Sequence, residues 1–160
     1  MNAKTRKQQL VEELAGKLRG ELETMERAQR TTIEGVTSEE AKPENDKDTR
    51  ALEQSYLARG QARRVEDLRD GLARVSVMPV RAFAAGASIA LGALVTIEEH
   101  DGDSTMFIAP HGGGLRLSTG EQVVTPASPL GKSLIGKTAG DECELVLAGR
   151  TRAFSIREVE

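Results

Sequence analysis

The chain reads LVEELAGKLRGELETMERAQRTTIEGV over residues 10–36 and LEQSYLARGQARRVEDLRDGLARV over residues 52–75. In both stretches an apolar side chain recurs every three or four residues, the spacing that gathers side chains on one face of a helix. We therefore predict two amphipathic helices. Their apolar positions are Leu10, Leu14, Leu18, Leu22, Met25, Ala28, Ile33 and Val36 in the first, and Leu52, Tyr56, Ala58, Ala62, Val65, Leu68, Leu72 and Val75 in the second.

The two apolar patterns match each other when the second is read backwards, as they must if the helices lie side by side and run in opposite directions. At about 1.5 Å per residue, such an antiparallel coiled-coil hairpin would be roughly 40 Å long or more. We assign residues 1–76 to it. The predicted partners are Leu10 with Val75, Leu14 with Leu72, Leu18 with Leu68, Leu22 with Val65, and Met25 with Ala62.

The composition favours a thin hairpin joined to a small globular module. Aromatic residues make up only 2% of the 160 residues and charged residues 29%, which is too few large side chains for one compact core of this size. A net charge of −3 gives no sign of a dedicated nucleic-acid-binding surface. Cys143 cannot form an internal disulfide, and two distant histidines make no metal cluster. Since neither a signal peptide nor a membrane span is evident, we expect a cytoplasmic protein without membrane contacts.

The turn between the helices is crowded with carboxylates and forms an acidic tip near residues 37–48. The second helix instead carries a row of arginines toward its base, from Arg59 to Arg74. Both features are also typical of solvated turns and solvated helix faces, so a structural role stays open beside a functional one. The acidic residues around the tip are Glu34, Glu39, Glu40, Glu44, Asp46 and Asp48, against Lys42 and Lys47.

Residues 77–160 have the pattern of short strands, after a proline at position 79 that stops the second helix. We predict an α+β fold in which the helical hairpin is followed by a small β-rich domain with one short helix. The predicted strands are residues 93–97, 106–109, 115–117, 122–124, 143–147 and 153–156, and the predicted helix is residues 129–135.

Residues 131–138, GKSLIGKT, satisfy the phosphate-loop pattern G-x-x-x-x-G-K-[ST]. That pattern binds phosphate when a buried strand enters the loop and a helix leaves it. Here the preceding residues are Thr-Pro-Ala-Ser-Pro and the following ones are a turn. We therefore reject nucleotide binding and predict a short helix that ends near Gly136.

The same segment, SPLGKSLIGK over residues 128–137 followed by a Gly-Asp turn at 140–141, resembles a hallmark of the bacterial Gre transcript cleavage factors. Glu44-Asn45, Glu53-Gln54, Gly60 and Glu66 match the spacing of the Gre tip and descending helix. The resemblance implies an FKBP-like domain at residues 77–160 that docks on bacterial RNA polymerase near its secondary channel, while the hairpin enters the channel. The docking residues it implies are Ser128, Pro129, Leu134, Ile135, Gly136 and Lys137.

The resemblance further implies an accessory factor, not an enzyme. A tip carboxylate would assist the Mg²⁺ ions of the polymerase, which prefer oxygen ligands, and the polymerase itself would hydrolyse the backtracked transcript. We expect no cofactor of the protein's own, a monomer, and contact with DNA and RNA mainly through the polymerase complex.

The tip departs from the Gre pattern Gly-Asp-Leu-x-Glu-Asn-Ala-Glu-Tyr. Aligned on Glu44 and Asn45, the chain has Ala41 where the Asp belongs and Lys47 in place of the second Glu. The resemblance therefore carries over Glu44 as the tip acid, with Asn45 as its neighbour. A proline just before Glu44 can change the course of the loop. The acids that could then compensate are Glu40, Asp46 and Asp48.

Three functions stay open from the sequence. The first is a Gre-type elongation factor that stimulates cleavage of backtracked transcripts. The second is a Gre-like regulator that binds the channel without promoting cleavage, or inhibits the polymerase. The third and least favoured is a prolyl isomerase or chaperone-like module, because residues 77–160 offer only Phe83, Phe107 and Phe154 to line such a site.

Overall fold

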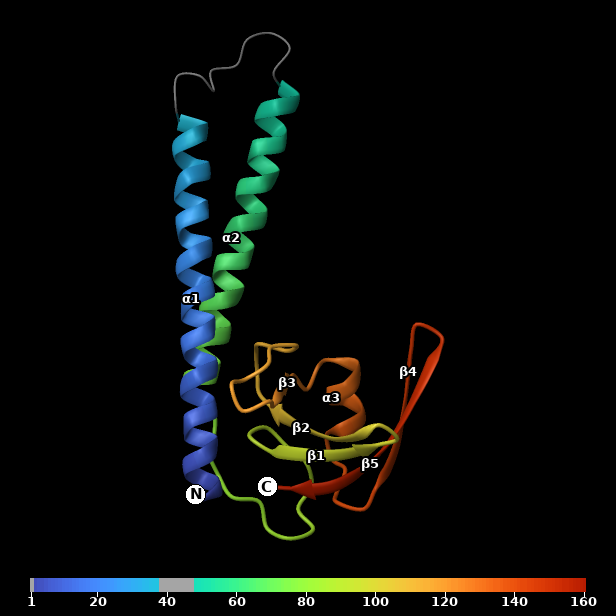
Figure 1. Ribbon diagram of the computed structural model, residues 1–160. Coiled ribbons are helices and arrows are strands. Elements are labelled where there is room, and N and C mark those ends of the chain that lie inside the picture. The colour runs from blue at the N-terminus through green and yellow to red at the C-terminus, as the bar shows by residue number, and fades with distance from the viewer. Residues whose placement is uncertain (1, 38–47) are drawn as a thin grey trace. The chain divides into compact units, whose positions relative to one another are not determined.

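The computed structural model describes residues 2–37 and 48–160, and its contacts divide the chain into two compact units (Figure 1). One unit consists of Met1–Ala15 with Ala73–Glu160, and the other is Gly16–Leu72. The combination of helices with one sheet confirms the predicted α+β class, whereas the division into domains at residue 76 stays a prediction. The elements are α1 (Ala3–Thr37), α2 (Asp48–Ser76), β1 (Leu94–Glu99), β2 (Gly102–Ile108), β3 (Gln122–Val124), α3 (Pro129–Leu134), β4 (Glu142–Leu147) and β5 (Arg150–Val159).

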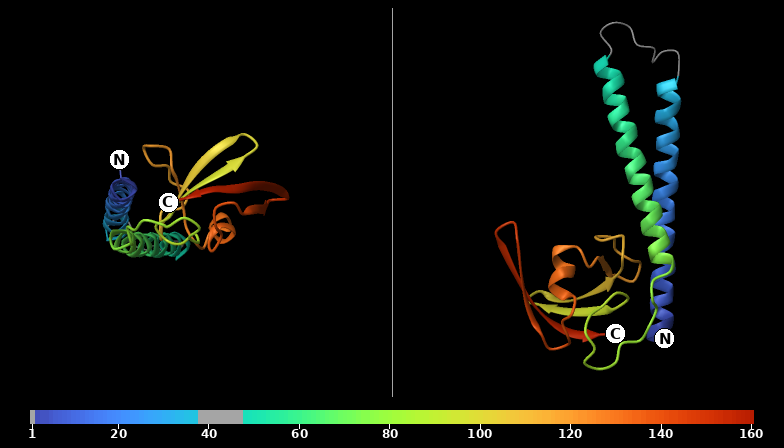
Figure 2. Two further views of the ribbon diagram at one scale, coloured as in Figure 1. Left: turned by 90° about the horizontal axis from the view of Figure 1, so that it is seen from below. Right: turned by 180° about the vertical axis from the view of Figure 1, so that it is seen from behind.

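The unit Gly16–Leu72 is a pair of antiparallel helical segments from α1 and α2 (Figures 1 and 2). Leu18, Val65 and Leu68 are buried, as the apolar pattern predicts for the seam between the helices. Burying such a side chain stabilises a fold by about 1.5–3 kcal/mol. No helix within the described ranges is long and apolar enough to cross a membrane.

Ion pairs join the two helices on their exposed sides. Arg64 pairs with Glu21 at 2.5 Å, and Arg69 pairs with Glu26 at 2.8 Å. Arg69 also pairs with Glu66 on its own helix at 2.9 Å, so one guanidinium holds two carboxylates. Because exposed pairs contribute only about 0–1 kcal/mol each, the apolar seam remains the main source of stability.

The apolar face of the hairpin is covered unevenly. Ile33, Leu52 and Tyr56 belong to the predicted seam but are exposed by 50%, 53% and 61%. The adjacent seam positions Ala58 and Ala62 carry only methyl groups, so they contribute little apolar surface to the contact between the two helices. The periodicity identified the helices correctly, but it overstated how far along them the seam is closed.

The sheet of the other unit has the strand order β3-β2-β1-β5-β4. β2 and β3 are parallel, and the other neighbouring strands are antiparallel. The strand predicted at residues 115–117 is wrong: only a single bridge joins Arg116 to Gln122. The reason is a tight turn, in which the N–H of Leu117 donates to the carbonyl of Glu121 and Gly120 has a φ of 99°.

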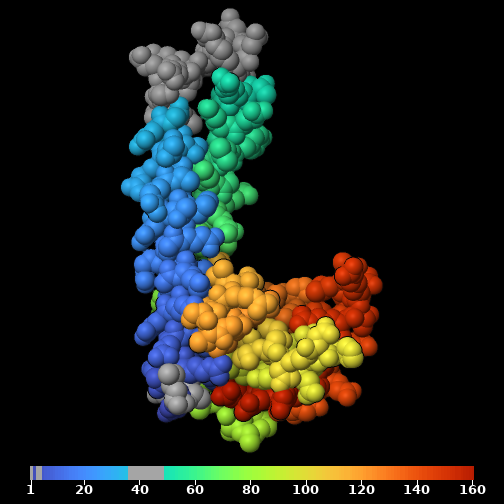
Figure 3. Space-filling view, in the orientation of Figure 1, coloured from blue at the N-terminus to red at the C-terminus, as the bar shows by residue number. Residues whose placement is uncertain are grey.

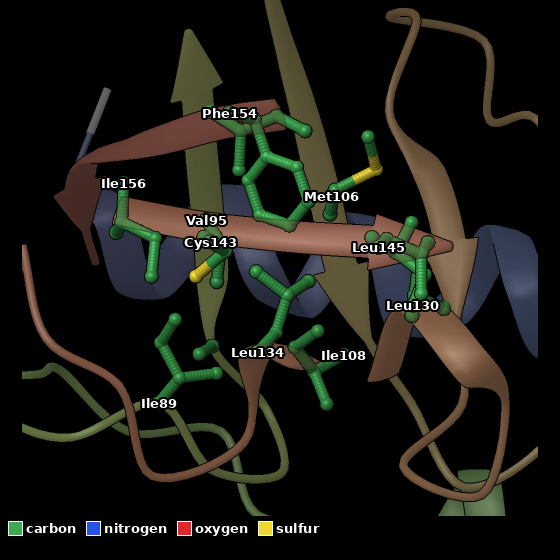
Figure 4. Packing of buried hydrophobic residues seen from close by; sticks show 13 residues of the cluster. Ile89, Val95, Met106, Ile108, Leu130, Leu134, Cys143, Leu145, Phe154 and Ile156 are labelled. Atoms are coloured by element: carbon green, nitrogen blue, oxygen red, sulfur yellow. The ribbon is translucent and has the colours of Figure 1, made fainter. Parts of the chain in front are cut away.

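One face of the sheet carries the main hydrophobic core (Figure 4). Leu130 and Leu134 of α3 belong there to one cluster with side chains of all five strands. Leu134 has no exposed surface. Replacing such a leucine by alanine typically costs about 2–5 kcal/mol. The strand residues in this core are Val95, Ile97, Met106, Ile108, Val124, Cys143, Leu145, Phe154 and Ile156.

The first turns of α1 are bound to the C-terminal half of the chain within the same unit. Arg6 donates to the carboxylate of Glu121 at 2.7 Å, and that carboxylate is 1% exposed. Glu13 accepts hydrogen bonds from both the backbone N–H and the hydroxyl of Ser118, at 2.7 and 2.8 Å. These contacts join residues more than 100 positions apart in the sequence.

Lys7, in the same first turns of α1, is a buried lysine. Its ammonium donates to the carbonyl of Arg81 at 2.8 Å and lies 4.6 Å from the centre of the Phe83 ring. Burial lowers the pKa of Lys7 from its ordinary 10.5 to about 8, although the carboxylate of Glu160 opposes this shift. The lysine therefore loses its proton more readily in the folded protein than in the unfolded chain.

This difference predicts that Lys7 makes stability depend on pH. Between about pH 8 and 10.5 the unfolded chain binds more protons at this position, so the free energy of unfolding should rise with pH, by at most about 3 kcal/mol. The raised pKa of Cys143 acts in the opposite direction over this range in every variant, so the test is the difference between proteins. Urea unfolding at pH 7.5 and pH 10 should show a free energy of unfolding that changes more favourably with pH in the wild type than in Lys7→Met. The exposed Lys132→Met is the control and should behave as the wild type. Equal pH dependence in all three proteins would contradict the prediction.

Candidate functional site

Ser128 caps the N-terminus of α3. Its backbone is extended, with φ −68° and ψ 157°, and its hydroxyl accepts a hydrogen bond from the N–H of Gly131 at 3.0 Å. The same hydroxyl donates to the carbonyl of Thr125 at 2.8 Å. Pro129 follows at the first helical position, where its fixed φ suits a helix and its missing N–H costs nothing. The Ser-Pro pair therefore fixes where α3 starts.

The end of α3 is fixed by backbone pairing with residue 89. The N–H of Gly136 donates to the carbonyl of Ile89 at 2.9 Å, and the N–H of Ile89 donates to the carbonyl of Lys137 at 2.8 Å. Gly136 has a φ of 82°, a conformation that glycine adopts without a steric penalty. The Leu-Ile-Gly-Lys part of the motif thus attaches α3 to the loop before β1.

The motif presents two kinds of surface. Leu134 is buried in the core, so its side chain supports α3 from beneath and does not face the solvent. Pro129, Lys132 and Lys137 are exposed, and Ile135 is 39% exposed. An apolar side chain between two lysines suits a partner surface that combines apolar and acidic groups. The docking role of this segment stays a prediction.

A hollow of about 350 Å³ lies beside the start of α3. Ser128, Pro129 and Leu130 line one part of it, and Leu145 and Leu147 of the β4–β5 hairpin line another. Leu147 is 47% exposed, so part of this apolar surface is accessible to a partner. Of the three aromatic rings of the C-terminal half, Phe107 and Phe154 are buried and none lines the hollow. This hollow therefore lacks the aromatic lining of a prolyl isomerase site.

The edge of the hollow carries an ion pair that the sequence pattern did not suggest. Arg152 of β5 donates two hydrogen bonds to the carboxylate of Glu99 on β1, one of them from Nη2 at 2.8 Å. The hydrogen bond from Arg152 lowers the pKa of Glu99, and the same bond raises the pKa of Arg152. The two residues are distant in sequence, so only the strand pairing reveals this contact.

The geometry does not match a phosphate-binding loop. α3 ends at Leu134, so the Gly-Lys-Thr part of the pattern follows a helix and does not open one. The N–H and hydroxyl of Thr138 both donate to the carboxylate of Asp141, at 2.8 and 3.3 Å. The threonine is thus engaged in a local turn with Asp141.

The tip residues Glu40, Glu44, Asn45 and Asp46 lie outside the described residues, and Asp48 is the first residue of α2. Among the residues that the structure does describe, no group of three or more His, Cys, Asp or Glu side chains could hold a metal ion. The tip acids and their assistance to Mg²⁺ therefore stay predictions.

Comparison with known proteins gives consistent relatives. The family described as "Transcription elongation factor, GreA/GreB, C-term" matches residues 85–160. The transcription elongation factor GreA of Rhodopseudomonas palustris (strain TIE-1) is 31% identical over 97 residues, which cover 61% of this chain and 60% of that protein. The first relatives are thus matched over about three fifths of their length. GreA of Hyphomonas neptunium is 28% identical over 146 residues, which cover 89% of this chain and 90% of that protein.

The fold was also compared with solved structures. The crystal structure of GreA factor homolog 1 (Gfh1) of Thermus thermophilus aligns with a TM-score of 0.40 and 20% identity, covering 91% of this chain and 94% of that chain.

The packing of α3 predicts that Gly131 tolerates no side chain. A Cβ at this position would lie 1.9 Å from the carbonyl oxygen of Thr125, which is backbone and cannot move aside easily. Gly131→Ala should therefore lower the free energy of unfolding by about 1–3 kcal/mol or more. Gly20→Ala is the control, because nothing lies within 4 Å of its Cβ and alanine favours a helix by about 0.5–1 kcal/mol. Chemical unfolding should show opposite signs; a neutral Gly131→Ala would refute the packing argument.

Proposed function

We propose that this chain binds bacterial RNA polymerase near the secondary channel, because its residues 85–160 match the C-terminal family of the GreA/GreB transcription elongation factors and GreA proteins are among its relatives. The relation extends beyond the C-terminal domain, since one GreA relative is matched over 90% of its own length. The observation that carries the proposal is the match of residues 85–160 together with the helical hairpin that precedes them.

The exposed side of α3 is the proposed docking surface on the polymerase. Ser128 and Gly136 position the helix, while Pro129, Ile135 and Lys137 reach the solvent. The neighbouring hollow offers further apolar surface for a partner side chain. Central apolar anchors with a polar rim are the usual composition of a specific protein interface.

The helical hairpin would bring its acidic tip to the active centre of the polymerase. Glu44 would supply an oxygen ligand or orient water at a weakly held Mg²⁺ ion, as two-metal phosphoryl chemistry requires. The polymerase would carry out the hydrolysis, and this protein would act in the cytoplasm as a monomeric accessory factor. DNA and RNA would be contacted mainly through the polymerase complex.

A specific feature of the sequence favours a second candidate function. Ala41 replaces the usual tip aspartate and Lys47 replaces a glutamate, so the tip has fewer of the acids that the Gre pattern uses. A Gre-like protein with such a tip would occupy the channel and slow transcription without promoting cleavage. Both candidates share the docking surface and differ only in what the tip does.

The tip is tested by transcript cleavage in a backtracked elongation complex at saturating protein. If the protein stimulates cleavage, Glu44→Gln should lower the rate by roughly 10–100-fold, the range for groups that support a metal site. Asp70→Asn, at an exposed acid of α2 to which no role is assigned, is the control and should leave the rate unchanged. Wild-type protein that binds without cleavage would support the regulator, and Ala41→Asp should then introduce measurable cleavage.

The docking surface is tested by the affinity for core RNA polymerase. Ile135→Ser combined with Lys137→Glu should weaken binding by roughly tenfold or more, because it removes an apolar anchor and reverses a charge at the interface. Val77→Ser combined with Arg19→Glu makes the same changes at two other exposed positions and should bind as the wild type. Equal affinity of the two double variants would exclude α3 as the docking element, and undetectable binding of the wild type would exclude the proposed function.

A further inference from the structure

Among the residues that the structure describes, β4 is the last strand of the sheet and its outer edge has no partner strand. The strand order ends with β5-β4, and all six residues of β4 pair with β5 alone. Within the described ranges, the backbone of β4 makes hydrogen bonds with no element other than β5. About half of the backbone N–H and C=O groups of an edge strand point outward and are free to pair with another chain.

The side chains of β4 alternate between the core and the solvent. Cys143 and Leu145 point into the core, whereas Glu142, Glu144 and Val146 are exposed, Val146 by 66%. Successive exposed positions on one face therefore offer two carboxylates and one aliphatic group. The strand also continues toward the free end of the β4–β5 hairpin, which lies at the surface (Figure 3).

A hollow of about 720 Å³ lies on the same face of the sheet. The register places Glu98 of β1 opposite Ser155 of β5, and Ser155 opposite Glu142 of β4, so the two glutamates flank a small side chain. Ala153 and Ser155 line the hollow together with Glu144. Short side chains between acidic ones leave room for a long cationic side chain from a bound segment.

The negative charge beside the free edge of β4 determines which kind of segment can pair with this strand. A second copy of this chain pairing through β4 would bring glutamates against glutamates, and like charges on directly opposed strands are destabilising. A segment with lysine or arginine at alternate positions would instead make attractive cross-strand pairs. Within the described residues, Glu98, Glu142 and Glu144 have no ion pair with a basic group of this chain, so their charge is available to a partner.

From this geometry we propose that the free edge of β4 binds an extended basic segment of a partner protein as an additional strand. The backbone of β4 supplies the hydrogen bonds, Glu142 and Glu144 select lysine or arginine, and Val146 contacts an aliphatic residue. The selecting side chains lie on the sheet face opposite α3, whereas Leu145 and Leu147 of the same strand line the hollow beside the proposed polymerase docking surface. The two surfaces therefore meet along β4, but binding at the β4 edge does not depend on polymerase binding.

The test is an NMR titration of the full ¹⁵N-labelled chain with the peptide acetyl-Thr-Val-Thr-Lys-Thr-Arg-Thr-amide. Antiparallel pairing would place its valine, lysine and arginine opposite Val146, Glu144 and Glu142. We expect the chemical-shift changes to be confined to β4 and its neighbours in the sheet. Shift changes dispersed over the surface, or none at millimolar peptide, would overturn the proposal.

Two double variants test whether the peptide binds at β4 or is attracted only by the overall charge of the protein. Glu142→Lys with Glu144→Lys should weaken binding about tenfold, because two attractive cross-strand pairs become repulsive. The double variant should also bind the peptide in which glutamates replace the lysine and arginine. Glu12→Lys with Glu23→Lys makes the same change in net charge on the exposed face of α1 and should bind as the wild type. Equal weakening in both variants would overturn the proposal.

Backbone pairing is tested without changing the protein. Two versions of the peptide are N-methylated at alternate residues, at the odd or at the even positions. Only one set of amides can face β4 in an added strand, so one version should lose binding and the other should keep it. Equal binding of the two versions would mean that charge alone attracts the peptide, and the proposed strand addition would be wrong.

Discussion

An ion pair between Arg6 and the buried carboxylate of Glu121 joins the start of α1 to the C-terminal half of the chain. Glu121 has almost no exposed surface, and Arg6 from the first helix donates to its carboxylate. Burial would raise the pKa of Glu121, but hydrogen bonds from Thr119 and Arg6 outweigh it and the pKa is lowered. Removing Arg6 would leave the carboxylate of Glu121 buried without its cation, which is unfavourable. The start of α1 therefore belongs to the same compact unit as the sheet.

Local patterns in the sequence were sufficient to identify most elements. Both long helices follow from the spacing of apolar residues, and the Ser-Pro and Leu-Ile-Gly-Lys segments mark the start and end of α3. The strand predicted at residues 115–117 failed because a run of alternating residues is also compatible with a tight turn closed by Leu117 and Glu121. Periodicity reports which face of an element is apolar, but not whether a partner covers that face.

Contacts between distant residues could not be predicted in the same way. The pairing of Glu99 with Arg152 depends on the register of β1 and β5, and that register includes a shift between Thr96 and Ile97. The burial of Lys7 likewise requires the carbonyl of Arg81 and a ring more than 70 positions away. A lysine in a helical pattern is normally expected in solvent. For the candidate site, the motif located α3 correctly, while only the packing separated the buried Leu134 from the exposed Ile135.

The burial of Cys143 affects how the protein can be labelled chemically. Its thiol is buried in the core, lies 3.7 Å from the carbonyl oxygen of Ser133, and burial raises its pKa. Thiolates, not thiols, react with maleimides and iodoacetamides, so this cysteine is a poor target for such reagents. A cysteine introduced at an exposed position would consequently be the preferred attachment point for a fluorophore or spin label. Distances within the protein can then be followed by spectroscopy with the native thiol left in place.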